Sequence, residues 1–140
     1  MDLFERMSEL SAEGFYCSQI INLLAFEMRG EEHPDVIRAL SGLPGGLGFS
    51  GKLCGSLTGG ACLIGFYAGK GAAEETAEPN LNEMIGQLVD WFETEIGQFY
   101  GGTDCACILE YEKENMQSPC PKIVQAVFEK TLEILEENNL

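Results

Sequence analysis

The sequence predicts an all-α fold, a compact single-domain helical bundle of about five main helices. Apolar residues recur at the three- and four-residue spacing of a helix over residues 13–29, 81–100 and 119–138. A further stretch, 52–68, is rich in small residues and follows a glycine-rich loop, so we expect it to be a central helix. With 140 residues, of which 45% are hydrophobic, the chain can form one core, and we expect a single domain over 1–140.

The N-terminal part is expected to contain two helices and a short third one. Residues 2–10 form a short amphipathic piece, and Ser11 is a candidate N-cap for the helix over 13–29, which Gly30 ends. A short helix over 35–40 is expected after a polar break. The inward face of the 13–29 helix carries Cys17, Ile20, Ile21, Leu24 and Met28.

Glycines inside the 52–68 helix indicate close contact with a neighbouring helix. In an exposed helix each would be destabilising by roughly 1 kcal/mol. Gly55 and Gly59 are four residues apart, as are Ser56 and Gly60, so the two pairs line adjacent sides of the helix. We therefore expect this helix to be the most buried one.

The last two long helices each show an apolar stripe. The stripe of the 81–100 helix is Ile85, Leu88, Phe92, Ile96 and Phe99, and the inner face of the last helix is Val124, Val127, Phe128, Thr131 and Leu135. Gly101-Gly102 breaks the first of these helices, and a polar loop over 110–118 precedes the second. The exposed remainder of the 81–100 helix could support a homodimer.

The charge of the chain argues against two classes of partner. The net charge of −15 and the pI of about 4.2 disfavour nucleic acid and anionic membrane surfaces. No segment is apolar over the ~18 residues of a membrane span, so we expect no membrane insertion. The N-terminal ten residues carry three acids and lack the pattern of a signal peptide, so the expected location is cytoplasmic.

The glycine-rich loop over 42–51 contains a G-x-G-x-x-G match at Gly46, Gly48 and Gly51. A dinucleotide-binding fingerprint needs a buried strand before the first glycine, and the residues before this loop do not form one. The loop can still let another group approach its backbone closely. Candidate contacts to a cofactor are Gly46, Gly48, Gly51, Gly55 and Gly59.

The six cysteines are the residues that indicate chemistry. In a reducing compartment they are metal ligands, redox thiols or small core residues rather than a disulfide framework. Cys54 falls in the first turn of the 52–68 helix, where free N–H groups are expected to lower the pKa of its thiol. Cys120 also lies at a helix start, between two prolines, whereas Cys62 is expected to pack. Cys105 and Cys107 form a C-x-C pair that suits a metal or a redox couple.

Hydrolytic chemistry is disfavoured by the sequence. His33 is the only histidine, and it lies in an exposed-looking turn beside two glutamates. No Ser/His/Asp set and no H-E-x-x-H motif is present.

Four cysteine-containing stretches resemble those of a known family. The stretches are GFYCSQ at Cys17, KLCGSLTGG at Cys54, FYGGTDC at Cys105 and SPCPKIV at Cys120. Together they resemble the C_GCAxxG_C_C family of redox-active proteins, and the resemblance covers most of the chain. It implies a redox site built from these four cysteines.

The chain departs from that family pattern in three places. Ser56 replaces the alanine of the motif, a change between small residues that should keep the packing. Cys62 and Cys107 are additional, so Cys105 and Cys107 both remain candidates for the third family cysteine. A related domain occurs in some multihaem cytochromes, but no C-x-x-C-H is present here and covalent c-type haem is not expected.

Three functions follow from these observations. In the first, Cys54 is an attacking thiolate that Cys120 or Cys105 resolves as a disulfide, with an unknown redox partner. In the second, zinc or an iron–sulfur cluster is bound by Cys17, Cys54, Cys105 or Cys107, and Cys120. In the third, the chain is a helical interaction protein with structural cysteines. The first is preferred slightly over the second.

Overall fold

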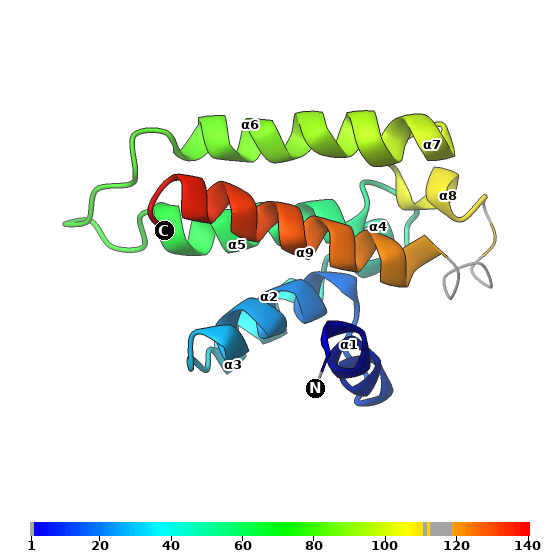
Figure 1. Ribbon diagram of the computed structural model, residues 1–140, viewed down its shortest axis with the longest axis horizontal. Coiled ribbons are helices and arrows are strands. Elements are labelled where there is room, and N and C mark those ends of the chain that lie inside the picture. The colour runs from blue at the N-terminus through cyan, green and yellow to red at the C-terminus, as the bar shows by residue number, and fades with distance from the viewer. Residues whose placement is uncertain (1, 111, 113–118) are drawn as a thin grey trace.

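The computed structural model describes residues 2–110, 112 and 119–140, and over these residues the protein is all-α, as predicted (Figure 1). Five helices in the described part have ten or more residues. They are α1 (Leu3–Ala12), α2 (Cys17–Met28), α5 (Gly55–Ala68), α6 (Leu81–Phe92) and α9 (Pro119–Glu137). The expected number of about five main helices therefore holds as an approximation.

Shorter segments connect the long helices. They are α3 (Pro34–Leu40), α4 (Pro44–Leu47), the π-helical turn η1 (Glu93–Gly97), α7 (Gln98–Tyr100) and α8 (Cys105–Ile108). The predicted loop over 110–118 lies mostly outside the described residues. No helix in the described part is long and apolar enough to cross a membrane.

Helix α5 occupies the centre of the bundle and packs against α2, α6 and α9 (Figure 1). Leu63 and Ile64 in its middle are fully buried. The predicted inner face of α9 is buried along its whole length, from Val124 to Leu135. Because α5 is surrounded on several sides, it shows little amphipathic character and depends on small residues for its contacts.

The glycines of α5 face neighbouring helices at short range. A Cβ built on Gly59 would lie 2.6 Å from the Cα of Ser18 in α2. A Cβ on Gly60 would lie 2.9 Å from Oγ1 of Thr131 in α9. The Asn22 side chain adds a polar link between α2 and α5, because its Nδ2 donates to the Gly59 carbonyl at 3.0 Å. The absence of side chains at Gly59 and Gly60 thus allows α2 and α9 to pack close to α5.

Helix α2 begins four residues later than the sequence predicts. Gly14 adopts a φ of +98°, and the chain turns there rather than continuing as a helix from residue 13. The Tyr16 N–H, just before the helix, is bound by Oε1 of Gln19 at 3.1 Å. Cys17 is therefore the first residue of α2 and not a mid-helix residue. The inward placement of Met28 is also wrong, because this side chain is 66% exposed.

A π-helical turn explains why Phe99 does not join the predicted apolar stripe. Leu88 and Phe92 are fully buried, as predicted, but Phe99 is 80% exposed. Between them lies η1, whose i→i+5 bonds add a residue to the turn and rotate the following residues out of the α-helical register. The stripe therefore ends before Phe99.

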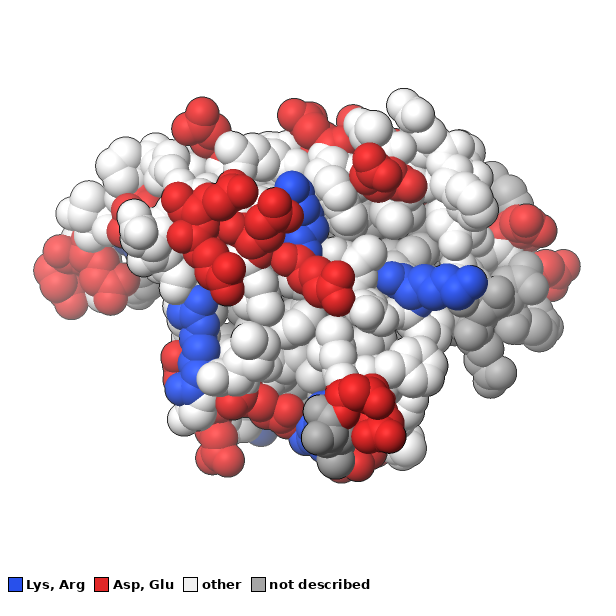
Figure 2. Space-filling view, in the orientation of Figure 1, with Lys and Arg blue, Asp and Glu red and all other residues white. Residues whose placement is uncertain are grey.

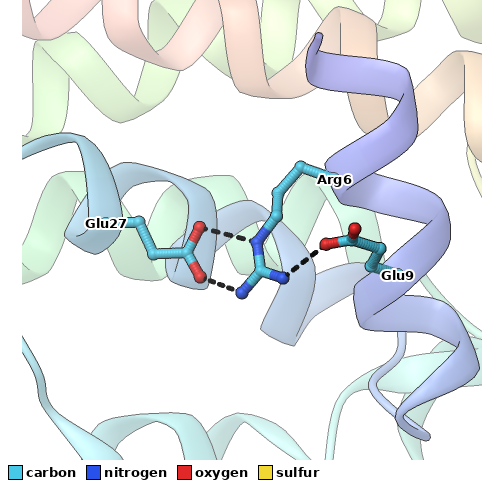
Figure 3. Close-up of polar contacts among 3 residues, drawn as sticks. All are labelled: Arg6, Glu9 and Glu27. Atoms are coloured by element: carbon cyan, nitrogen blue, oxygen red, sulfur yellow. Dashed lines mark hydrogen bonds and ion pairs between the residues drawn. The ribbon is translucent and has the colours of Figure 1, made fainter. Parts of the chain in front are cut away.

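Helix α1 is attached to α2 by an apolar contact and an ion-pair group. Leu10 is buried, at 1% exposure. Nε of Arg6 donates to Oε2 of Glu27 at 3.0 Å, its Nη2 binds the other carboxylate oxygen, and its Nη1 binds Glu9 at 2.9 Å (Figure 3). These side chains are partly exposed, so the group is expected to add only about 0.2–1 kcal/mol per pair.

The acidic composition is visible on the molecular surface. On the face drawn in Figure 2, acidic side chains are spread over the surface, with few basic side chains among them. This distribution agrees with the net charge of −15.

Two glycines of the same helix provide a test of this packing. In Gly59→Ala the new methyl group would overlap α2, so we expect the free energy of unfolding to fall by about 1–3 kcal/mol. Nothing lies within 4 Å of the Cβ position of Gly65, so Gly65→Ala should raise it by roughly 0.5–1 kcal/mol through helix propensity. Urea denaturation of both variants measures the difference. Equal effects would contradict the close approach of α2 and α5.

Candidate functional site

Four cysteines lie at the starts of four helices. Cys17 is the first residue of α2, Cys54 is the N-cap of α5, Cys105 is the first residue of α8, and Cys120 is the second residue of α9. The loop at α4, helix α8 and the start of α9 gather at one end of the molecule, opposite the C-terminus (Figure 1). Helix starts present free N–H groups, which favour a negative charge nearby.

A short antiparallel pairing places Cys54 beside Cys105. Leu53 and Asp104 form an isolated β-bridge. The Cys54 N–H donates to the Thr103 carbonyl at 3.1 Å, and the Cys105 N–H donates to the Lys52 carbonyl at 2.6 Å. Because side chains alternate along paired strands, Cys54 and Cys105 lie on the same side as diagonal neighbours.

This pairing corrects the predicted start of the central helix. Residues 52–54 were expected to be helical, but they are extended partners of 103–105, and α5 begins at Gly55. Cys54 thus caps the helix instead of lying in its first turn. The pairing joins segments about fifty residues apart, so no local pattern could indicate it.

Cys17 reaches the same cluster through contact with Gly55. A Cβ built on Gly55 would lie 2.7 Å from Sγ of Cys17 and 3.0 Å from the Leu43 carbonyl. The thiol therefore occupies the space that a side chain at residue 55 would need. Gly55 directly follows Cys54, so this contact brings Cys17 to the start of α5.

Burial dominates the electrostatics of the cluster. It raises the pKa of Cys17 and of Cys120 to about 12 and also raises the pKa of Cys54 and Cys105. Negative charge on the other thiols acts in the same direction: Cys54 raises the pKa of Cys17 and of Cys105, and Cys17, Cys54 and Cys105 all raise the pKa of Cys120. The four thiols therefore influence one another and form one group, here called the cysteine cluster.

The predicted lowering of the Cys54 pKa is wrong in its net direction. The N–H groups of Ser56 and Leu57 do bind the thiol and lower its pKa, as expected at a helix start. Burial has the larger effect, because the surrounding protein replaces the water that would solvate a thiolate. Cys54 is 8% exposed.

Ser56 belongs to the site, although the sequence predicts only a packing role for it. Its hydroxyl hydrogen-bonds to the thiols of both Cys17 and Cys54 and lowers the pKa of each. The side chain is 2% exposed, so water does not compete for these bonds. The sequence signal for this role is the replacement of the motif's alanine by Ser56, because alanine has no hydroxyl.

The two additional cysteines differ from the cluster in their surroundings. Cys62 is exposed on α5, so the prediction that it packs is wrong. Sγ of Cys107 lies 3.1 Å from the Cβ position of Gly102, whereas Cys105 is paired to the segment that carries Cys54. The structure therefore places Cys105, rather than Cys107, beside Cys54.

The glycine-rich loop is closely packed against the site. Backbone atoms of Lys52 would lie 2.3 Å from a Cβ on Gly46, and Ala106 would lie 3.0 Å from a Cβ on Gly51. Gly59 meets α2, and nothing lies within 4 Å at Gly48. Packing thus accounts for Gly46, Gly51, Gly55 and Gly59. A cofactor contact by any of these four glycines, or by Gly48, stays a prediction.

The same loop holds two side chains in a strained backbone conformation. Leu47 has a φ of +68° and Phe49 a φ of +63°. The left-handed conformation costs a residue with a side chain roughly 1–2 kcal/mol. Both side chains are exposed, at 52% and 38%, and the Phe49 ring makes an edge contact with Tyr16 at 5.3 Å between ring centres. Strain of this kind is concentrated at functional sites.

Two cavities differ in their relation to the cluster. A cavity of about 190 Å³ has Cys105 in its wall. A larger one, of about 480 Å³, lies over α2 and α3 and has His33 in its wall but no cysteine. His33 is half-buried and binds Oε1 of Glu31 at 2.8 Å. The histidine expected in an exposed turn is thus held by a carboxylate and packs against Phe26.

The donor set of the cluster suits zinc or an iron–sulfur cluster, since thiolates are the preferred ligands of both. Within 2–110, 112 and 119–140, however, no group of three or more His, Cys, Asp or Glu side chains is arranged to hold a metal ion. A metal role for Cys17, Cys54, Cys105, Cys107 and Cys120 stays a prediction.

Removing the Ser56 hydroxyl tests its effect on the cluster. In Ser56→Ala the pKa of Cys17 and of Cys54 should rise further, because each thiolate loses a hydrogen-bond donor. Alkylation of the reduced protein, followed by mass spectrometry across pH, should show both thiols reacting more slowly than in the wild type at each pH. Ser8→Ala, which removes an exposed hydroxyl on α1 away from the cluster, is the control. Unchanged alkylation profiles in Ser56→Ala would contradict the assignment.

The raised pKa values also predict how stability depends on pH. A thiol with a higher pKa in the folded protein favours folding below its unfolded pKa of 9.0, and this stability is lost as pH rises toward about 12. We therefore expect the free energy of unfolding of the reduced protein to fall above about pH 9. In Cys120→Ala the decline should be shallower, by up to about 1.4 kcal/mol per pH unit. Urea denaturation under reductant measures both slopes, and parallel slopes would contradict the raised pKa of Cys120.

Comparison with known proteins agrees with this geometry. The family model described as "Putative redox-active protein (C_GCAxxG_C_C)" matches residues 15–134, a range that contains the whole cysteine cluster. No curated protein and no solved structure matches the chain. Because the match covers most of the chain, the chain belongs to the C_GCAxxG_C_C family.

Proposed function

We propose that the protein is a thiol redox protein, in which the cysteine cluster exchanges two electrons with a partner by forming and breaking one disulfide. The observation that carries this proposal is the meeting of Cys17, Cys54, Cys105 and Cys120 at four helix starts, close enough that charge on the first three raises the pKa of Cys120. Membership of a family described as redox-active supports it.

Cys54 is the central thiol in this proposal. It is linked to Cys105 by the backbone pairing of 52–54 with 103–105, and to Cys17 by the Gly55 contact. Either neighbour can supply the second sulfur of a disulfide. This role differs from the attacking role predicted from the sequence, because Cys54 is buried and is not part of the wall of either cavity described above.

Burial favours a disulfide over a thiolate in this site. A disulfide carries no charge, so the desolvation that raises the four pKa values does not oppose it. The reduced thiols remain protonated at neutral pH, and this protonation slows their non-specific oxidation by small oxidants. The Ser56 hydroxyl and the helix-start N–H groups stabilise the thiolate that must form briefly during exchange.

The second candidate function is binding of a metal or an iron–sulfur cluster by the same thiols. It is favoured by the convergence of four sulfurs that raise one another's pKa, because a cation would offset their mutual repulsion. When bound, such a group would supply structural stability or one-electron transfer.

One experiment separates these candidates. Protein with Cys62→Ser, which removes an exposed thiol outside the cluster, is purified without oxygen and analysed for metal, sulfide and free thiols. Mild oxidation should then remove about two thiols per chain, and dithiothreitol should restore them. Adding Cys54→Ser should abolish this reversible loss.

Two results would count against the redox proposal. Stoichiometric zinc, or iron with sulfide, held by thiols that form no disulfide would favour the metal candidate. Thiols that neither bind metal nor oxidise reversibly would make the cysteines structural.

A further inference from the structure

The small cavity opens the cysteine cluster at Cys105, the member of the Cys54–Cys105 pair that lines its wall. Its volume is about 190 Å³, below the roughly 300–1,000 Å³ of common ligand pockets. Its wall is formed by Gly45, Phe49, Ser50, Gly51, Cys105, Ala106, Leu109 and Glu112. Cys17, Cys54 and Cys120 are not part of this wall. A molecule in the cavity therefore meets Cys105 first.

The apolar side of the cavity is fixed by the strained loop. The Phe49 ring lies over Gly45, where a built Cβ would be 2.2 Å from the ring. Tyr16, the residue before Cys17, contacts the same ring at its edge. A side chain at residue 45 would displace the ring, so the glycine and the aromatic residue together define the width of the opening.

Glu112 gives the described part of the wall its charge. Glu112 is the only charged side chain among the described residues that line the cavity, and the chain carries a net charge of −15. A negatively charged substrate would be repelled by the Glu112 carboxylate and by the net negative charge of the chain, whereas an uncharged or positively charged substrate would not.

From these observations we infer that Cys105 is the thiol through which the cluster passes electrons to its substrate, and that the substrate is a disulfide flanked by small uncharged or positively charged groups. The inference rests on the proposed redox function and adds its attacking thiol and its substrate class.

The reaction balances with the residues present. The Cys105 thiol loses its proton and attacks one sulfur of the substrate disulfide, so a mixed disulfide forms and the other substrate half leaves as a thiol. Cys54 then attacks Sγ of Cys105, the second substrate half leaves as a thiol, and a Cys54–Cys105 disulfide remains. The protein loses two electrons and two protons, and both are recovered in the two product thiols.

The test uses three disulfides of similar size and different charge, under anaerobic conditions. They are cystamine, which is positive, 2-hydroxyethyl disulfide, which is neutral, and 3,3′-dithiodipropionate, which is negative. The reference protein carries Cys62→Ser and Cys107→Ser, so that neither thiol outside the cluster reacts with a probe. The rate of adduct formation is measured by mass spectrometry after an early acid quench.

A trapping variant identifies the attacking thiol directly. With Cys54→Ser added to the reference protein, the thiol beside Cys105 is absent, and the probe should remain attached to Cys105 in a peptide map. Cys105→Ser should slow adduct formation at least tenfold, a loss of about 1.4 kcal/mol of transition-state stabilisation. Ser8→Ala, which removes an exposed hydroxyl on α1 outside both the cluster and the cavity wall, should leave the rate of the first adduct within about twofold of the reference. An adduct found mainly on Cys17 or Cys120 would overturn the assignment of Cys105.

The order of the probe rates tests the substrate class. Cystamine should react at least about tenfold faster than 3,3′-dithiodipropionate at low salt, and high salt should reduce this ratio. Glu112→Gln should reduce it at low salt by at least about twofold. Equal rates for the three probes, or a ratio unaffected by Glu112→Gln, would overturn the charge selection.

These outcomes are separable from failure of the proposed function. If the reference protein forms an internal disulfide but the adduct maps elsewhere, only the attacking role of Cys105 is refuted. If no oxidant produces an internal disulfide, the redox function itself is refuted, and the role of Cys105 with it.

Discussion

The close approach of α2 and α5 is the contact on which the site depends. Gly55 leaves room for the Cys17 thiol, and Gly59 leaves room for the backbone of Ser18 one turn further along. Because both glycines lie on one face of α5, the two helices can start at the same end of the bundle with their first residues in contact. The C-G-x-x-x-G spacing is thus a packing motif, and it also sets the distance between two of the four thiols.

The cluster combines two opposing influences on its charge. Burial and mutual repulsion keep the four thiols neutral, while helix-start N–H groups and the Ser56 hydroxyl favour an anion at Cys54 and Cys17. Burial is the larger influence, so the resting state is protonated. The donors remain in place for the moment at which a thiolate forms, and they need no rearrangement then because the backbone already holds them.

The helices and the glycine contacts could be predicted from the sequence, because periodicity and residue size are local properties. The β-bridge between Leu53 and Asp104 could not, since it joins distant segments through backbone atoms. The exposure of Phe99 depends on a π-helical turn that no residue type marks clearly. The pKa of Cys54 was predicted with the wrong sign because its helix position is local information, whereas its burial is a property of the whole bundle. The functional role of the four candidate cysteines stays a prediction, and the pairing that places Cys105 rather than Cys107 beside Cys54 is visible only in the structure.

The cluster takes its first cysteine from residue 17 and its last from residue 120, at opposite ends of the matched region. Such a site has a high sequence separation, so it cannot assemble early while the chain is folding. During synthesis, three of its helix starts emerge before α9 exists, and their thiols stay apart from the fourth until that helix docks. The complete cluster of four thiols therefore forms only after α9 has docked, which makes the docking of α9 the last step in its assembly.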